Sequence, residues 1–131
     1  MLTERAPTYQ LTRGDRRFIG LHLIFAVLAL TIGSLFGPLQ AFQWSGLDLY
    51  QYLEPIGLEN YYKGLTIHGV LNALVWTTFF ITGFLTLATI AGLRRPLRFP
   101  LLNRIGFGTM VVGLVMTGIP ILAGWASVLY T

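Results

Sequence analysis

The sequence predicts an all-α integral membrane protein with three transmembrane helices. Of its 131 residues, 54% are hydrophobic and only 11% are charged, whereas soluble domains are about 25% charged. The charged residues gather in short segments between long apolar runs, and a helix needs about 20 apolar residues to cross a bilayer. The predicted spans are residues 18–42, 65–93 and 105–123.

The composition also excludes several functional classes. The chain has no cysteine, so it carries no disulfide, iron–sulfur ligand or cysteine-type zinc site. Its net charge of +4 comes from basic residues beside the apolar runs, which indicates membrane topology and not nucleic-acid binding. No nucleophile–base pattern and no glycine-rich phosphate loop is present, so we expect no catalytic residue in this segment.

The first span carries two signals for its boundaries and one for its packing. Residues 1–17 form a polar tail, which we predict to be irregular because Pro7 and Gly14 disfavour a continuous helix. Gly33 and Gly37 have the small-xxx-small spacing that lets another helix approach closely. Pro38 is expected to kink or end the helix near Gly37.

The loops predict the orientation in the membrane. Loop 43–62 contains aromatic interface anchors and a short interfacial helix at 49–53, ending before Pro55. Trp125 and Tyr130 are expected at the interface after the third span. Arginines gather before the first span and in the second loop: Arg5, Arg13, Arg16, Arg17, Arg94, Arg95, Arg98 and Arg104. By the positive-inside rule, the amino terminus is cytoplasmic and the first loop faces outward.

His68 is the main candidate functional residue, because an ionisable side chain in a membrane span is costly and usually functional. Helical spacing places it on one face with Gly64 and Asn72, and the small residues Gly69 and Ala73 lie beside it. This leaves room for a flat group such as a porphyrin, whose usual axial ligand is a neutral histidine. The second ring nitrogen then needs an acceptor, either a backbone carbonyl or a side chain on another helix.

The residue types leave three roles for His68 open: haem ligation, proton relay, or hydrogen bonding to a neighbouring helix or water. The second histidine, His22, lies about one turn from the predicted cytoplasmic interface, where an amphipathic ring is at home. We expect it to have no cofactor role. The polar residues within the spans are mostly threonines, which we expect to bond to their own helix backbone and not to form a proton path.

Several segments resemble a known family. Residues 64–73 (GLTIHGVLNA) resemble the second-helix motif of subunit I of haem–copper oxygen reductases, closest to the B branch of ba3-type cytochrome c oxidases. Residues 34–41 (SLFGPLQA) resemble the end of the first helix in that branch. Tyr61-Tyr62 and residues 125–131 (WASVLYT) match as well, so the resemblance extends over residues 18–131 in the right order.

The resemblance implies a role for His68 as axial ligand of the iron of a low-spin haem b near the outer face. This haem would receive electrons from the copper-containing subunit II. The whole enzyme would oxidise cytochrome c, reduce oxygen to water and translocate protons across a prokaryotic plasma membrane. It would also hold a high-spin haem and a copper ion, whose ligands lie outside this chain.

In that family, subunit I is a bundle of roughly twelve helices. The resemblance therefore implies that residues 1–131 are one unit, the amino-terminal fragment of a longer subunit I, whose remainder is a partner. We expect this segment to be inactive alone. Two alternatives remain: the large subunit of a nitric oxide reductase, and a cofactor-free three-helix accessory membrane protein.

Overall fold

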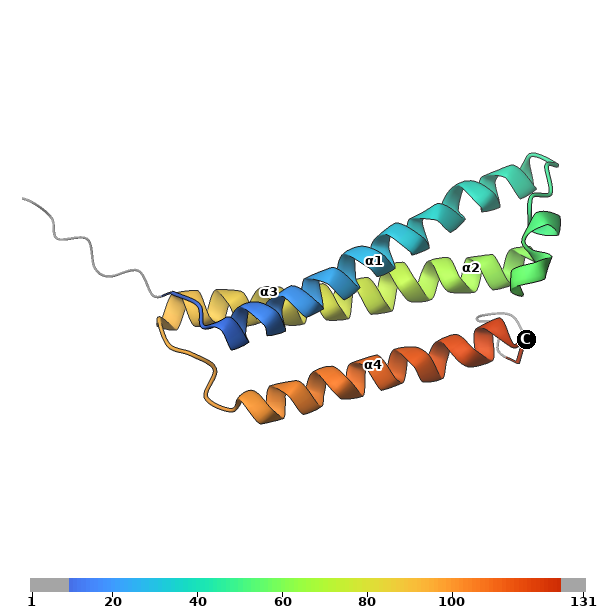
Figure 1. Ribbon diagram of the computed structural model, residues 1–131. Coiled ribbons are helices and arrows are strands. Elements are labelled where there is room, and N and C mark those ends of the chain that lie inside the picture. The colour runs from blue at the N-terminus through green and yellow to red at the C-terminus, as the bar shows by residue number, and fades with distance from the viewer. Residues whose placement is uncertain (1–9, 126–131) are drawn as a thin grey trace, which may run out of the picture.

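The computed structural model describes residues 10–125, and all regular structure within them is helical. The long helices are α1 (Arg13–Trp44), the continuous stretch of α2 (Tyr61–Gly69), η3 (Val70–Val75) and α3 (Trp76–Leu93), and α4 (Pro100–Leu122), as Figure 1 shows. Three helical stretches are long and apolar enough to cross a membrane: Arg13–Trp44, Tyr61–Leu93 and Pro100–Leu122. The three predicted spans are therefore confirmed, and Tyr130 lies outside the described residues.

The amino-terminal boundary of α1 was predicted wrongly. The helix includes residues 13–17, which were assigned to an irregular tail. Thr12 caps it: its Oγ1 accepts the backbone N–H of Asp15 at 3.1 Å and donates to Asp15 Oδ2 at 2.7 Å. Such a cap is worth about 1 kcal/mol, which offsets the cost of about 1 kcal/mol for Gly14 in a helix.

Pro38 does not end α1, which continues to Trp44. Of the two predicted effects of Pro38, a kink or an end of the helix near Gly37, the end does not occur. A proline inside a helix lacks the N–H that would donate one hydrogen bond, and its ring crowds the carbonyl group four residues earlier. In apolar surroundings, ending the helix would leave further backbone groups unsatisfied. The helix therefore continues until Ser45, whose N–H donates to Ala41 O at 3.1 Å.

The first loop contains two short 3₁₀ turns, η1 (Tyr50–Tyr52) and η2 (Glu54–Ile56). The predicted helix at 49–53 is thus a single 3₁₀ turn, which ends before Pro55 as predicted, and Pro55 lies inside the second turn. Trp44 Nε1–H donates to the Tyr61 hydroxyl at 3.1 Å and joins the end of α1 to the start of α2.

The second and third spans begin earlier than predicted. Asn60 caps α2, and Pro100 starts α4, where its fixed φ suits the first helical turn. The second span ends at Leu93 as predicted, and Arg94 follows in the left-handed region at φ 53°. The π-helical turn η3 within this span was not predicted.

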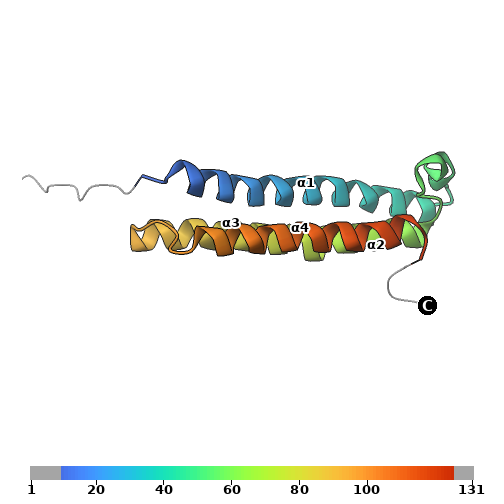
Figure 2. The same ribbon diagram turned by 60° about the horizontal axis from the view of Figure 1, so that its bottom comes forward.

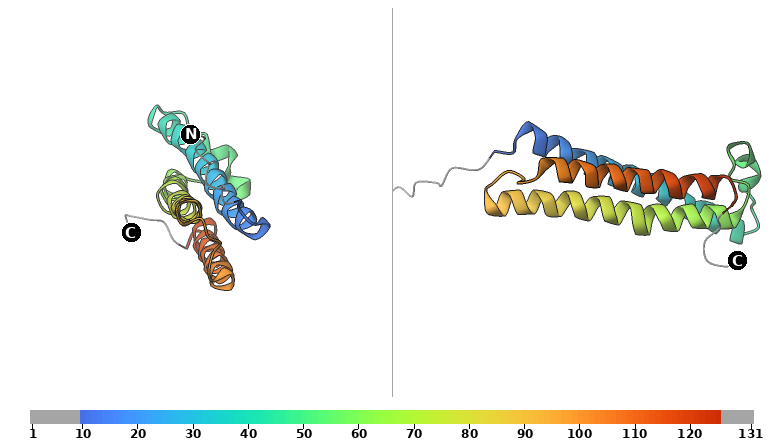
Figure 3. Two further views of the ribbon diagram at one scale, coloured as in Figure 1. Left: turned by 90° about the vertical axis from the view of Figure 1, so that its left-hand side faces the viewer. Right: turned by 90° about the horizontal axis from the view of Figure 1, so that it is seen from below.

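The helices pack side by side, with α1 crossing the second span obliquely (Figures 1 and 2). Ala26 and Ala29 of α1 form a buried cluster with Val75 and Phe79 of the second span. Phe107, Met110, Val111 and Leu114 of α4 pack against this cluster only partly buried. In α4 only Ile121 is buried, so most of this helix presents an exposed apolar surface along the outside of the group (Figure 3).

Candidate functional site

His68 lies on α2 directly before η3 and turns its ring toward α1. Its Nδ1 is 2.8 Å from the carbonyl oxygen of Gly33. A carbonyl accepts only, so the proton must sit on Nδ1, which donates to Gly33. The structure thus supplies the acceptor that the sequence led us to expect, a backbone carbonyl on another helix. This hydrogen bond fixes both the tautomer and the orientation of the imidazole.

The small residues of α1 make this close approach between the helices. A Cβ atom added to Gly33 would lie 2.9 Å from the Cβ of Leu71 and 2.9 Å from the Cγ of Asn72. A Cβ atom added to Gly37 would lie 3.5 Å from Cε1 of His68, an ordinary contact. The predicted small-xxx-small face therefore does bring α1 onto the second span, with His68 at the contact.

Asn72 completes the surroundings of Nδ1. Its Nδ2 lies 3.2 Å from Nδ1 of His68, and its Oδ1 is buried without a hydrogen-bond partner. Because Nδ1 already donates to Gly33, it cannot accept from the amide nitrogen. Rotating the amide by half a turn exchanges its oxygen and nitrogen and gives Nδ1–H a second acceptor. Asn72 is therefore placed to share the histidine proton with Gly33.

The other ring nitrogen of His68, Nε2, has no hydrogen-bond partner among residues 10–125 and is not one of their buried unpartnered atoms. Its lone pair is thus accessible. The neighbouring helix surface is open, because Gly69 and Ala73 are exposed and a Cβ atom on Gly69 would meet nothing within 4 Å. A histidine whose ring is fixed through Nδ1, and whose Nε2 has no partner among residues 10–125, fits a ligand of a flat metal macrocycle.

The described residues contain no group of three or more His, Cys, Asp or Glu that could hold a bare metal ion. A macrocycle, by contrast, needs only one or two ligands from the protein. The π-helical turn η3 starts two residues after His68, and such turns are frequent at functional sites. Val75, the last residue of this turn, and Phe79 beyond it are buried against α1, while Thr78 is exposed.

His22, which was predicted about one turn from the cytoplasmic interface, is enclosed by neighbouring helices, and the sequence did not predict this burial. The residue is 0% exposed, and its Nδ1 lies 2.9 Å from Phe18 O. Its ring centroid lies 4.4 Å from that of Phe18, 4.8 Å from Phe107 and 5.9 Å from Phe79. Aromatic rings from three helices thus close over it, and its Nε2 is buried without a partner. A sequence shows which turn a residue occupies but not which other helices cover it.

Lys63 is a structural residue that the sequence analysis did not identify. The residue is 6% exposed. Its Nζ donates to Gly57 O at 2.9 Å, Leu122 O at 3.1 Å and both carboxylate oxygens of Glu59 at 2.7 and 2.9 Å. These hydrogen bonds lower the pKa of the Glu59 carboxyl. Lys63 thereby joins the first loop, the start of α2 and the end of α4. The i,i+4 spacing from Glu59 was the available signal.

Tyr50 packs on the turn of α2 that precedes His68. It is 1% exposed, and a Cβ atom on Gly64 would collide with its hydroxyl group. Burial raises the pKa of Tyr50, with smaller contributions from the nearby Tyr61 and Asp48. Gly64 and His68 were predicted to share one face of the helix. They contact different neighbours, because Gly64 lies against the first loop and His68 lies against α1.

Five threonines within the spans bond to their own helices, as predicted. Each of the following hydroxyl groups donates to a carbonyl of the preceding turn: Thr66, Thr77, Thr82, Thr109 and Thr117. These hydroxyl protons are committed to backbone carbonyls, which is the pattern that hydroxyl side chains adopt in membrane helices.

Residues 17–131 match the family model described as cytochrome c and quinol oxidase polypeptide I. The chain is 38% identical over 111 residues to "Cytochrome c oxidase subunit 1" of Thermus thermophilus. That match covers 83% of this chain and 20% of the relative, so the chain spans about a fifth of the relative's length.

Proposed function

Since this chain belongs to the family of cytochrome c and quinol oxidase polypeptide I, we propose that it forms the amino-terminal part of the catalytic subunit of a ba3-type cytochrome c oxidase. Membership of the haem–copper oxidase family confirms the predicted resemblance at that level. Its three apolar helices make it a multi-pass membrane protein. The ba3 branch is the finer part of the proposal, supported by the motifs at residues 34–41 and 64–73.

In this proposal, Nε2 of His68 is the axial ligand to the iron of a low-spin haem b. The observation that carries it is the hydrogen bond of 2.8 Å from Nδ1–H to Gly33 O. This bond leaves the lone pair of Nε2 free to bind iron. The carbonyl acceptor holds the ring in one orientation. Haem, when bound, supplies one-electron transfer. Gly33 and Asn72 act through His68, as residues that position its ring.

The proposal places the chain in a prokaryotic plasma membrane with a cytoplasmic amino terminus. Arginines at one end of the helix group support this orientation, because the opposite end has Lys63, whose charge is paired with Glu59. His68 then lies toward the outer face, where the copper-containing subunit II would pass on electrons from cytochrome c. The remainder of subunit I would supply the ligands of the high-spin haem and copper, and proton translocation would belong to the whole enzyme.

The test is a reduced-minus-oxidised visible spectrum of membranes that contain the full-length protein. His68→Leu is expected to abolish the low-spin b-type band while the protein still inserts. His22→Leu is the matched control, because it removes the other histidine of the chain, and it is expected to keep the band. An unchanged band in His68→Leu membranes would reject the ligand assignment and favour the accessory-protein alternative. Uptake of nitric oxide instead of oxygen by these membranes would favour the reductase alternative.

A further inference from the structure

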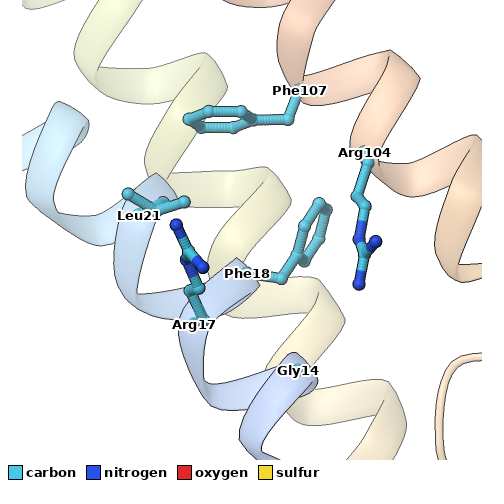
Figure 4. A pocket seen from close by; sticks show the side chains of 6 residues that line it. All are labelled: Gly14, Arg17, Phe18, Leu21, Arg104 and Phe107. Atoms are coloured by element: carbon cyan, nitrogen blue, oxygen red, sulfur yellow. The ribbon is translucent and has the colours of Figure 1, made fainter.

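A second concave site lies between α1 and α4, at the end of the helix group opposite Lys63. It is a cavity of about 360 Å³ lined by Gly14, Arg17, Phe18, Leu21, Arg104 and Phe107. Figure 4 shows the side chain of Phe18 between the two arginine side chains, with Phe107 of α4 across from Leu21 of α1. The haem proposal uses none of these residues.

Neither arginine of this cavity has a partner within the described part of the chain. Arg17 and Arg104 are exposed, and no hydrogen bond or ion pair is formed by either guanidinium with residues 10–125. They come from two different helices and line the same cavity. Guanidinium groups are well suited to phosphate, because their planar N–H groups can bind two of its oxygens at once.

The charge around the cavity favours an anion over a zwitterion. Further arginines stand at the same end of the helices: Arg13, Arg16, Arg94, Arg95 and Arg98. The acidic residue closest in sequence, Asp15, is buried and accepts a hydrogen bond from Thr12. Its carboxylate is thus engaged within the first turn of α1. The cavity consequently has an excess of positive charge that the described residues do not neutralise.

The walls of the cavity are apolar, which distinguishes a lipid from a free anion. The rings of Phe18 and Phe107 lie 6.5 Å apart between centroids and form one side of it. Beyond them, α4 exposes a continuous apolar surface that includes Ile105, Val112 and Val115. A phosphate ion would gain nothing from this surface, whereas the acyl chains of a lipid would cover it.

We propose that this cavity binds the headgroup of an anionic phospholipid such as phosphatidylglycerol. Arg17 and Arg104 hold the phosphate, and the acyl chains lie along Phe18, Phe107 and the exposed face of α4. Basic pockets between transmembrane helices at the cytoplasmic side bind anionic headgroups by this combination of charge and apolar surface. The site does not depend on haem binding.

The test measures lipid retained by the purified full-length protein. After mild detergent washing, native mass spectrometry counts the bound phosphatidylglycerol molecules per protein. Arg17→Gln and Arg104→Gln should each weaken retention roughly tenfold, because each removes a charge-assisted contact, and the double variant should lose one lipid. The pair Arg13→Gln and Arg95→Gln removes the same charge at the same end without touching the cavity, and should retain that lipid.

A second arm identifies the occupant. A phosphatidylglycerol with a photoreactive group near its headgroup should label the peptides that contain Phe18 and Phe107, and phosphatidylcholine should not compete. Labelling that inorganic phosphate abolishes would show a free-anion site and overturn the proposal. Equal lipid retention in the cavity variants and the control pair would also overturn it. The proposal would also be overturned if cross-linking found a later segment of the polypeptide in the cavity.

Discussion

The contact between Gly33 and the second span allows a quantitative prediction for Gly33→Ala. The new Cβ atom would lie 2.9 Å from the Cβ of Leu71, whereas carbon atoms pack at about 3.5–4.0 Å. Because that Cβ atom is bonded directly to the backbone of the second span, the helices must separate. Overpacking costs about 1–3 kcal/mol, and stretching the hydrogen bond to His68 costs about 1 kcal/mol.

The better helix propensity of alanine returns up to about 1 kcal/mol. We therefore expect Gly33→Ala to lower the free energy of unfolding by about 2 kcal/mol. Gly20→Ala is the matched control in the same helix, because a Cβ atom there would meet nothing within 4 Å. Gly37→Ala is intermediate, since its Cβ atom would make an ordinary contact of 3.5 Å with His68.

Equilibrium unfolding of the full-length protein in mixed detergent micelles, followed by circular dichroism, measures these differences. The expected order of stability is Gly20→Ala first, then Gly37→Ala, and Gly33→Ala last. The haem band of the Gly33 variant should also shift or weaken, because the orientation of His68 depends on this contact. If Gly33→Ala were as stable as Gly20→Ala, the close approach of the helices at this position would be refuted.

Other predictions concern the ends and the interior of the bundle. Lys63→Met should lower stability by about 2 kcal/mol, since it leaves buried carbonyl groups without a donor, and Glu59→Gln should cost less in the same unfolding assay. The pKa of Glu59 is lowered in the folded state, so the stability that its carboxylate contributes is present above its ordinary pKa of about 4.3 and is lost as the pH falls further. Unfolding measured from about pH 6 to about pH 3 should show this loss. Glu59→Gln should abolish this part of the pH dependence. Thr12→Ala should cost about 1 kcal/mol through the lost cap, seen as faster hydrogen exchange in the first turn of α1. His22→Phe should leave stability unchanged or raise it, because it removes a buried nitrogen without a partner, whereas a large loss would mean that the imidazole has a polar partner in the full-length protein.

Much of the architecture could be predicted from the sequence because a membrane span depends on local composition. A run of apolar residues bounded by charges is sufficient to predict a transmembrane helix, and all three spans were found in this way. The predicted ends of these helices were less accurate. Thr12 and Pro100 extend α1 and α4 beyond the apolar runs through local capping, and hydrophobicity alone does not reveal a cap.

The candidate site was also predictable in part. His68 stood out as an ionisable residue in an apolar run, and its need for an acceptor followed from elementary chemistry. That the acceptor is Gly33 O could not be deduced, since the residues are 35 positions apart and meet only where two helices cross. The π-helical turn after His68 was likewise not visible, because it changes the hydrogen-bond register without a distinctive residue pattern.

The sequence by itself determined the number of spans and the charge at their ends, and it singled out His68, the haem ligand that we propose. Only the tertiary structure decided which side chains are enclosed. His22 is covered by rings from other helices, and Lys63 reaches a carbonyl at the end of α4, 59 positions away. The physical reason is that hydrophobicity and capping act within a few residues, whereas burial and hydrogen-bond partners depend on how separate helices cross.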